Sequence, residues 1–363
     1  MRDSRSPSVD TAEGPDTPPP PVRRPRGSTL RPVHLLLGTA ALAVLLLVSV
    51  LTGAAELGWQ RVLAEIGAQL TGGVSPLSER EAAILWQLRV PRVVLAVLVG
   101  GALAISGAAF QGVFRNPLAD PYLLGAAAGA GLSVTVVVTA IPQVNLGTTG
   151  IAQVAAFLGA LGGVGLTWLI GRSAGSDTAT LVLAGVAVGA FLTAAQTFVQ
   201  QLRVESLQRV YMWILGRLST TGWNEVLTVL PALCLAVVVL CACGRLLDLL
   251  GTGDEEAAAL GVRPGRVRAL VLVAASLATA SAVSVAGLIG FVGLVVPHLV
   301  RLALGGSYRV IVPVSLLFGG AFLVGADMLA RTVMAPAELP IGVITAFTGA
   351  PFFALLLHTS RRR

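Results

Sequence analysis

The sequence predicts an all-α membrane protein whose chain crosses a lipid bilayer about ten times. Of its 363 residues, 55% are hydrophobic and only 12% are charged, against about 25% charged in soluble domains. Long uncharged runs, such as residues 33–51 and 93–109, approach the roughly 20 apolar residues that a membrane helix needs. Lipid offers no partner to a backbone amide, so each run should be helical. The alternating pattern of barrel strands is absent.

The chain divides into a membrane domain, residues 33–358, and two basic ends. Residues 1–32 contain eight prolines and six arginines, a composition that cannot bury a core and predicts a disordered cytoplasmic tail. The apolar run after this tail is too long for the hydrophobic region of a signal peptide, so we expect it to remain as the first span. Residues 359–363 end in three arginines and form a short basic tail.

Ten apolar segments are candidate spans. In order, they lie near residues 33–54, 93–113, 121–141, 151–170, 180–201, 226–247, 267–285, 287–304, 310–331 and 341–358. Small residues recur every four positions in several of them, for example Gly125, Gly129 and Ser133, and then Gly185, Gly189, Thr193 and Thr197. Membrane helices associate through such small-residue ridges, so these ridges predict a compact bundle.

The arginines predict the orientation of the chain. The net charge is +7, and all 25 basic residues are arginine. With the N-terminus in the cytoplasm, 17 arginines fall in inside segments and eight in outside segments. Because cytoplasmic loops of membrane proteins carry the excess of basic residues, we expect both termini to lie inside. The same rule accounts for the positive charge without a nucleic-acid partner.

Ionisable residues within spans usually mark function in a membrane protein, and here they are nearly missing. Asp327 and Arg331 are four residues apart and predict a pair on one helix face. His298 follows Pro297 near a span end, and we interpret it as a helix boundary rather than a metal ligand. A carrier driven by protons or sodium normally keeps acidic residues at mid-membrane, so their absence favours an energy source outside this chain. A secondary transporter or channel acting alone is the alternative.

The sequence indicates no catalytic residues, no metal site and no cofactor. Residues 171–175 match the G-x-S-x-G pattern, but they fall in a short loop between two spans rather than after a strand. A Walker A loop needs a lysine, and the chain has none. Its three cysteines all lie in residues 234–243 without the paired spacing of a zinc site. A membrane enzyme is therefore a third hypothesis that lacks a convergent polar site.

The polar segment 252–264 predicts a short helix outside the membrane. Thr252 and Glu255 have capping-box spacing, and residues 254–256 are acidic and fall in the first turn, where the helix dipole favours anions. Gly261 is placed to end the helix, and Pro264 prevents its continuation. Such a helix is either an ordinary surface helix or a lever that a cytoplasmic partner pushes.

Two arginines of the segment WQLRVPR, Arg89 and Arg92, lie on the predicted outside, against the charge bias. An acidic docking protein would give them a role. The alternative is that they anchor the span at the lipid headgroups.

Six segments together resemble the permease subunits of type II ABC importers for ferric siderophores, cobalamin and haem. They are WQLRVPR (86–92), ISGAAFQGVFRNPLADPYLLGAAAGAG (105–131), LVLAGVAVG (181–189), GDEEAAALGV (253–262), AGLIGFVGLVVPHLVRL (286–302) and AELPIGVITAFTGAPFF (337–353). The resemblance runs in order from about residue 34 to 358. It implies a ten-helix permease of the cell membrane, paired with an identical or paralogous copy. Two cytoplasmic ATPase subunits and an extracytoplasmic binding protein would be its other partners.

The resemblance also implies roles for single residues. The short cytoplasmic helix would fit a cleft in the ATPase through Asp254, Glu255, Glu256, Ala258, Leu260 and Gly261. The binding protein would dock on Arg89, Arg92 and Arg331. The cytoplasmic gate would lie at the NPLA turn and before the fifth span, at Asn116, Leu118 and Thr178. The implied cargo is an iron chelate such as a ferric siderophore, with cobalamin or haem as the alternative, and ATP would be hydrolysed by the separate subunits.

Overall fold

A computed structural model describes residues 32–53, 55, 57–144, 146, 150–175, 178–218 and 222–360, and these are helical with connecting loops and no strands. The helices are α1 (Pro32–Leu51), α2 (Trp59–Thr71), α3 (Glu79–Ala83), the π-helical η1 (Ile84–Arg89), α4 (Val90–Phe114), α5 (Ala126–Ala140), α6 (Ile151–Ala174), α7 (Thr178–Leu202), the 3-10 turn η2 (Val204–Ser206), α8 (Leu207–Ile214), α9 (Asn224–Ala242), α10 (Gly244–Leu250), α11 (Asp254–Ala259), α12 (Pro264–Ala286), α13 (Val292–Leu304), α14 (Tyr308–Thr332) and α15 (Ile341–Ser360). Residues 1–31 of the predicted N-terminal tail and residues 361–363 of the C-terminal one lie outside the described residues, whereas Pro32 begins α1 and residues 359 and 360 end α15.

Ten of these helices are apolar, which confirms the predicted all-α membrane fold. Six are long and apolar enough to cross a bilayer. They are the continuous helix Glu79–Phe114, which contains α3, η1 and α4, and the helices α6, α7, α9, α12 and α14. Shorter apolar stretches lie in α1, α5, α13 and α15. Several boundaries were wrong. The spans expected from residues 121 and 287 begin five residues later, at Ala126 and Val292, and the span expected from residue 93 continues a helix that begins at Glu79. The segment expected as a single span over 226–247 breaks after Ala242. Gly244 begins α10 there and lies against the backbone of Arg309 at the start of α14.

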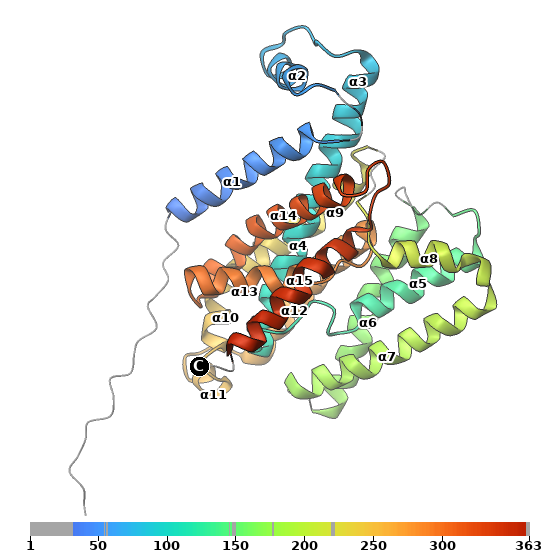
Figure 1. The fold of residues 1–363 in the computed structure, drawn as a ribbon. Coiled ribbons are helices and arrows are strands. Elements are labelled where there is room, and N and C mark those ends of the chain that lie inside the picture. Colours follow the sequence, from blue (N-terminus) through green and yellow to red (C-terminus); the bar gives the residue numbers. More distant parts are fainter. Residues whose placement is uncertain are drawn as a thin grey trace, which may run out of the picture.

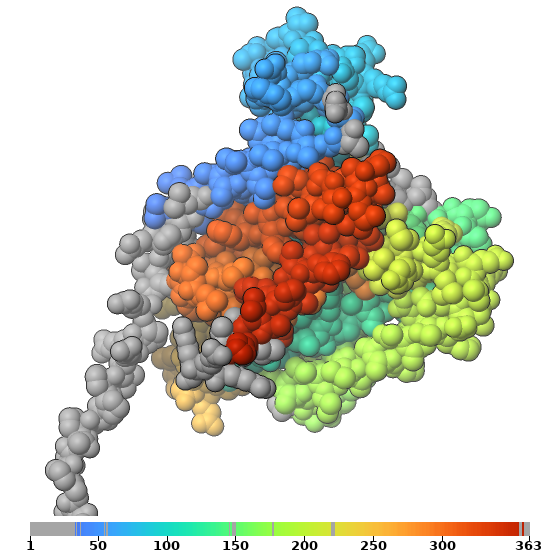
Figure 2. Space-filling model, viewed as in Figure 1, coloured from blue at the N-terminus to red at the C-terminus, as the bar shows by residue number. Residues whose placement is uncertain are grey.

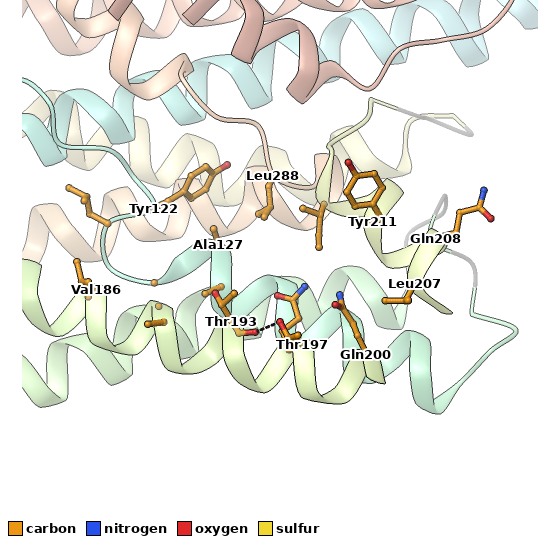
Figure 3. Close-up of a pocket in the computed structure, with 18 residues that line it drawn as sticks. Tyr122, Ala127, Val186, Thr193, Thr197, Gln200, Leu207, Gln208, Tyr211 and Leu288 are labelled. Atoms are coloured by element: carbon orange, nitrogen blue, oxygen red, sulfur yellow. Dashed lines mark hydrogen bonds between the residues drawn. The ribbon is translucent and has the colours of Figure 1, made fainter. Parts of the chain in front are cut away.

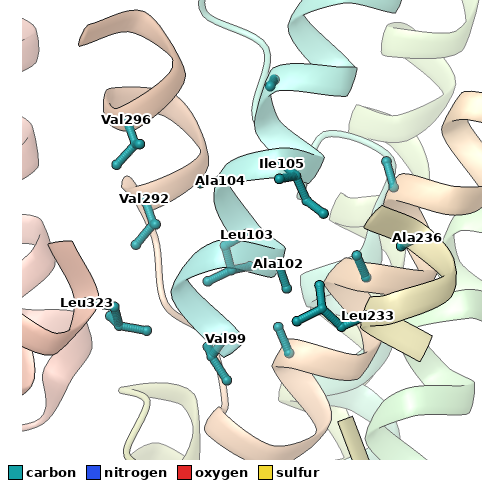
Figure 4. Packing of buried hydrophobic residues seen from close by; sticks show 14 of the residues in the cluster. Val99, Ala102, Leu103, Ala104, Ile105, Leu233, Ala236, Val292, Val296 and Leu323 are labelled. Atoms are coloured by element: carbon teal, nitrogen blue, oxygen red, sulfur yellow. The ribbon is translucent and has the colours of Figure 1, made fainter. Parts of the chain in front are cut away.

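Helix α4 is the centre of the bundle. Every residue from Val99 to Phe114 is buried, as expected of a helix that is apolar on all sides and enclosed by other helices. Figure 4 shows the packing around it, with Leu233 from α9, Val292 from α13 and Leu323 from α14. The small side chains of α4 allow close contact, and a Cβ added to Gly100 would lie 2.2 Å from the carbonyl oxygen of Gly319 in α14.

Helices α5, α6, α7 and α8 form a second group at one side of the bundle (Figure 1). The ridge of Gly125, Gly129 and Ser133 packs as predicted, against Gly159 and Gly163 of α6. A Cβ added to Gly129 would lie 2.1 Å from the carbonyl oxygen of Gly159. A small apolar core that includes Val210 and Trp213 of α8 joins this group to α12.

The bundle has two distinct ends, which we call the hairpin end and the α11 end. Helices α2 and α3 project from the hairpin end, and α11 lies at the opposite end (Figures 1 and 2). Helices α2 and α3 form a helical hairpin. It was not predicted, because α2 is amphipathic and both helices are too short to span the membrane. Its buried Glu65 accepts hydrogen bonds from Trp86 Nε1 (3.0 Å) and Gln69 Nε2 (3.2 Å), and Ser78 with Glu81 forms a capping box at α3.

Candidate functional site

At the α11 end, three charged residues from three elements meet, and we call them the α11-end cluster: Arg115, Asp254 and Arg268. Asp254 Oδ1 pairs with Arg268 Nη2 at 2.6 Å and also with Arg115 Nη2. Burial of the carboxyl opposes ionisation, but hydrogen bonds from Arg268 and Arg115 outweigh it and hold the pKa of Asp254 below its ordinary value. The contribution of this cluster to stability is therefore present above about pH 4 and is lost as the pH falls through the depressed pKa.

The sequence predicted the end of helix α11 correctly but not the residue that caps its start. The predicted capping box is wrong, because Gly253 is the N-cap and the Thr252 hydroxyl instead donates to the Leu249 carbonyl at 2.9 Å. The acidic first turn of residues 254–256 is present as predicted. Gly261 ends the helix with φ +82°, and Val262 N donates to the Ala257 carbonyl at 3.0 Å, the bond of a Schellman motif.

The outer surface of α11 carries an exposed apolar side chain. Ala257 is fully buried and anchors the helix to the bundle, whereas Leu260 is 63% exposed at its end. The predicted contact residues Glu255, Glu256 and Ala258 are exposed as well. The end of α11 therefore presents one exposed leucine among exposed acidic residues, at the α11 end of the bundle.

The predicted gate residues also lie at this end. Asn116 Oδ1 accepts a hydrogen bond from Leu118 N at 2.9 Å, and Ala119 N donates to the Asn116 carbonyl at 3.1 Å. These bonds fold the NPLA segment into a tight turn directly after α4, with Asn116 and Leu118 exposed. Thr178 is the first residue of α7, whose start lies at the same end in Figure 1.

At the hairpin end, four charged residues form what we call the hairpin-end cluster: Arg92, Asp327, Arg331 and Glu338. Arg92 donates to Asp327 Oδ1 at 2.9 Å and makes two hydrogen bonds of 2.9 Å to Glu338. Arg331 Nε lies 2.9 Å from Asp327 Oδ2, so the predicted helix-face pair exists and Arg92 joins it. The acidic partners of Arg92 therefore come from this chain itself.

Arg89 lies beside this cluster but has no acidic partner among the described residues. Its guanidinium donates to backbone carbonyls at the end of α1, including Val50 at 3.1 Å, and the residue is 8% exposed. Arg331 likewise donates to the Thr52 carbonyl at 2.9 Å and to Ser49 Oγ at 2.9 Å. All three arginines predicted to dock a partner thus lie together and also hold α1, α4 and α14 in place.

We expect Asp327→Asn to destabilise the folded subunit by about 3 kcal/mol or more, since breaking a buried ion pair leaves an uncompensated charge. The Asp327 side chain is 2% exposed and forms ion pairs with the guanidinium groups of both Arg92 and Arg331. Thermal unfolding in detergent, followed by tryptophan fluorescence, measures the loss. Glu338→Gln is the matched control, because the Glu338 side chain is 52% exposed and exposed pairs contribute at most about 1 kcal/mol. Equal unfolding temperatures for Asp327→Asn and wild type would contradict the prediction.

A cavity of about 810 Å³ opens between α7, α8 and the segment before α5. Figure 3 shows Thr193, Thr197 and Gln200 on the α7 wall, with Tyr122 and Leu288 opposite them. A second, apolar cavity of about 560 Å³ adjoins it along α15. The two share Ile214 and Leu288, so they adjoin, and we call the surface that carries both cavities the hollow face from α7 to α15.

The ridge on α7 serves this cavity as well as packing, which the sequence did not indicate. Gly185 packs as predicted, because a Cβ there would lie 2.1 Å from the carbonyl oxygen of Leu123. Gly189 has open space around it, and Thr193 and Thr197 line the cavity. Gln196 and Gln200 line the cavity as well, but amide side chains also occur at contacts between membrane helices, so no signal in the sequence separates the two roles.

His298 was wrongly interpreted as a helix boundary. It lies inside α13, which continues through Pro297 to Leu304, and both ring nitrogens are buried without a hydrogen-bond partner in the described structure. Its ring meets Phe352 of α15 at a centroid distance of 6.5 Å. Among the described residues, no group of three His, Cys, Asp or Glu side chains is placed to hold a metal ion.

Comparison with known proteins identifies the family. The model of the FecCD transport family matches residues 41–359. This chain belongs to that family. It is therefore the membrane-spanning permease component of an ABC importer, a multi-pass membrane protein and not an enzyme, as the resemblance implied.

Curated relatives of this FecCD permease cover most of its length. It is 40% identical over 345 residues to the cobalamin import system permease protein BtuC of Halobacterium salinarum, with 91% of each chain covered. It is 40% identical to the hemin transport system permease protein HmuU of Yersinia pestis, over 77% of this chain and 84% of that one. The Fe(3+)-citrate import system permease protein YfmD of Bacillus subtilis is 36% identical over 78% of this chain and 83% of its own.

A solved structure shares the fold. It shows an inward-facing conformation of a transporter assigned to the metal-chelate type of ABC transporter, with a TM-score of 0.78 and 27% sequence identity. The similarity covers 91% of this chain and all of the other. The all-α permease fold expected from the sequence is thus confirmed.

Proposed function

We propose that this FecCD permease carries an iron chelate, such as a ferric siderophore, across the cell membrane. The hollow face from α7 to α15 supports this proposal, because its wide, mainly apolar surface with a few amide and hydroxyl groups suits a bulky chelate held by weak, distributed contacts. Relatives named for Fe(3+)-citrate, hemin and cobalamin all show comparable identity. Cobalamin or haem is therefore the second candidate cargo.

We propose further that the pathway forms between two copies of the permease, identical or paralogous. In one subunit the hollow face is open at its side, and Thr193 and Thr197 are exposed with Gln200 beside them. Amide groups facing lipid hydrocarbon are costly. A second copy set against α7 and α15 would shield these groups from lipid and close the pathway.

The α11 end would face the cytosol, with both termini inside, and would hold two ATPase subunits. This orientation is supported by the distribution of the arginines, 17 of which belong to the segments expected at that end. Leu260, the acidic first turn of α11 and Gly261 would then enter a cleft of the ATPase. Asn116, Leu118 and Thr178 would form the cytoplasmic gate next to it.

The hairpin end would receive an extracytoplasmic binding protein, with docking at Arg89, Arg92 and Arg331. The geometry adds two conditions to this prediction. Arg89 and the Arg331 side chain are 8% and 9% exposed, so the first contact would be with Arg92. Arg92 already contacts two carboxylates of its own chain, and Glu338 is the one at the surface. An acidic side chain of the binding protein would therefore displace Glu338 and leave the buried Asp327 in place.

Uptake into proteoliposomes tests the proposed function. The permease is reconstituted with its cognate ATPase and binding protein, and iron-55 ferric citrate, iron-55 ferrichrome, haemin and cyanocobalamin are offered in parallel. We expect uptake of an iron chelate that requires ATP on the α11 side. If only haemin or only cyanocobalamin were taken up, the proposed cargo would be wrong and that compound would replace it. Uptake driven by an ion gradient without the ATPase would refute the importer mechanism in favour of a secondary transporter.

A further inference from the structure

Arg115 joins two parts of the molecule whose movements the proposed function requires to be linked. It is the last residue before the gate turn Asn116–Ala119, and its side chain reaches α11 across 139 residues of sequence. Its Nε donates to the Leu250 carbonyl at 2.6 Å, at the end of α10. Its Nη2 pairs with Asp254, the first residue of α11.

The backbone at Arg115 has an unusual conformation that favours another residue type. Its φ of 49° and ψ of 32° are left-handed, and it closes α4 as the penultimate residue of a Schellman motif, with Asn116 N donating to the Gln111 carbonyl at 3.2 Å. Glycine is the usual residue at this position because it has no Cβ. In the described structure, Arg115 and Phe291 are the two non-glycine residues with positive φ. Strained residues of this kind concentrate at functional sites.

The contacts of Arg115 explain why an arginine occupies a glycine position. Its guanidinium bonds to α10 and α11 at once, while its backbone is fixed to α4, the fully enclosed central helix. Asp254 is held from the other side by Arg268 in the second turn of α12. A displacement of α11 would therefore pull on Arg115, and the next residue along the chain is the first of the gate turn.

We propose that Arg115 is a positioning residue that transmits the movement of α11 to the gate turn. This inference rests on the proposed function, because α11 must be the element that the ATPase moves. It assigns to Arg115 a role in coupling that is separate from its contribution to folding. Substitution by glycine separates the two roles, since glycine relaxes the backbone and removes the link.

The test compares Arg115→Gly, Arg115→Lys and a matched control, Arg266→Gln, in the proteoliposome assay, with the probe that the wild type takes up. Arg266 is an exposed arginine of the first turn of α12. We expect Arg115→Gly to keep or raise the unfolding temperature while the number of molecules transported per ATP hydrolysed falls at least fivefold. Arg115→Lys keeps the charge beside Asp254 and should recover part of that ratio. Arg266→Gln should behave as wild type.

Two results would overturn the inference. One is an Arg115→Gly variant that transports as many molecules per ATP as wild type. The other is a variant in which unfolding temperature, ATP hydrolysis and uptake all fall together, which would make Arg115 a structural residue only. If the wild type itself shows no ATP-driven uptake, the proposed function fails instead, so the two failures are distinguishable.

Discussion

We expect Leu260→Asp to abolish ATP-driven uptake while the permease itself stays folded. Leu260 is 63% exposed at the end of α11, so its replacement leaves the core of the bundle intact. Residues that fill a central pocket of a partner are the ones that contribute about 2 kcal/mol or more to binding, or roughly thirtyfold in affinity, and the proposed contact places Leu260 in such a pocket. A carboxylate in that pocket would add a desolvation cost. The measurements are uptake in proteoliposomes and co-purification of the ATPase with the variant.

Leu260→Met is the matched control for this substitution. Methionine conserves the volume and apolar character of the side chain, so uptake should stay within a few-fold of wild type. If Leu260→Asp assembles with the ATPase and transports as well as Leu260→Met, then α11 is an ordinary surface helix and the lever interpretation is wrong.

Gly107→Ala is the substitution with the largest expected effect on stability. A Cβ at this position would lie 1.8 Å from the carbonyl oxygen of Gly293 and 2.5 Å from its Cα. These are backbone atoms of α13, which cannot move aside as a flexible side chain can. Separation of α4 from α13 would loosen the centre of the bundle, and we expect a loss of about 4 kcal/mol or more, at the upper end for single substitutions. Thermal unfolding in detergent measures it.

Gly165→Ala in α6 is the control, because a Cβ there meets nothing within 4 Å. Alanine has the higher helix propensity, so the unfolding temperature should be unchanged or slightly raised. A Gly107→Ala protein that unfolds at the temperature of the Gly165→Ala protein would show that α4 and α13 do not approach as closely as described.

The apolar spans could be predicted from sequence because the bilayer imposes one local rule on each of them. A run of some 20 apolar residues must become a helix whatever its neighbours do. The position of α11 could also be read locally, from an acidic first turn at Asp254 and a glycine at 261 that ends the helix. Its N-cap was predicted wrongly, because the N-cap residue is Gly253, which has no side chain that a capping pattern could reveal.

The partners of charged residues could not be predicted, because they come from distant parts of the chain. Arg92 binds Asp327, which is 235 residues away, and no local pattern links the two positions. The cavity face of α7 was missed for a related reason. Thr193 and Thr197 fit a packing ridge and a cavity wall equally well, and only the placement of α8 and Tyr122 decides between them.

The side of the membrane on which α11 lies is the claim that the whole mechanism depends on. The test uses two variants, Glu255→Cys and Leu70→Cys, each made in a protein whose three native cysteines are replaced. Vesicles that contain either variant are labelled with a membrane-impermeant maleimide. We predict that position 255 reacts only in inside-out vesicles and position 70 only in right-side-out vesicles. Labelling of position 255 from the outside would contradict the orientation, the contact with the ATPase and the roles given to both ends of the bundle.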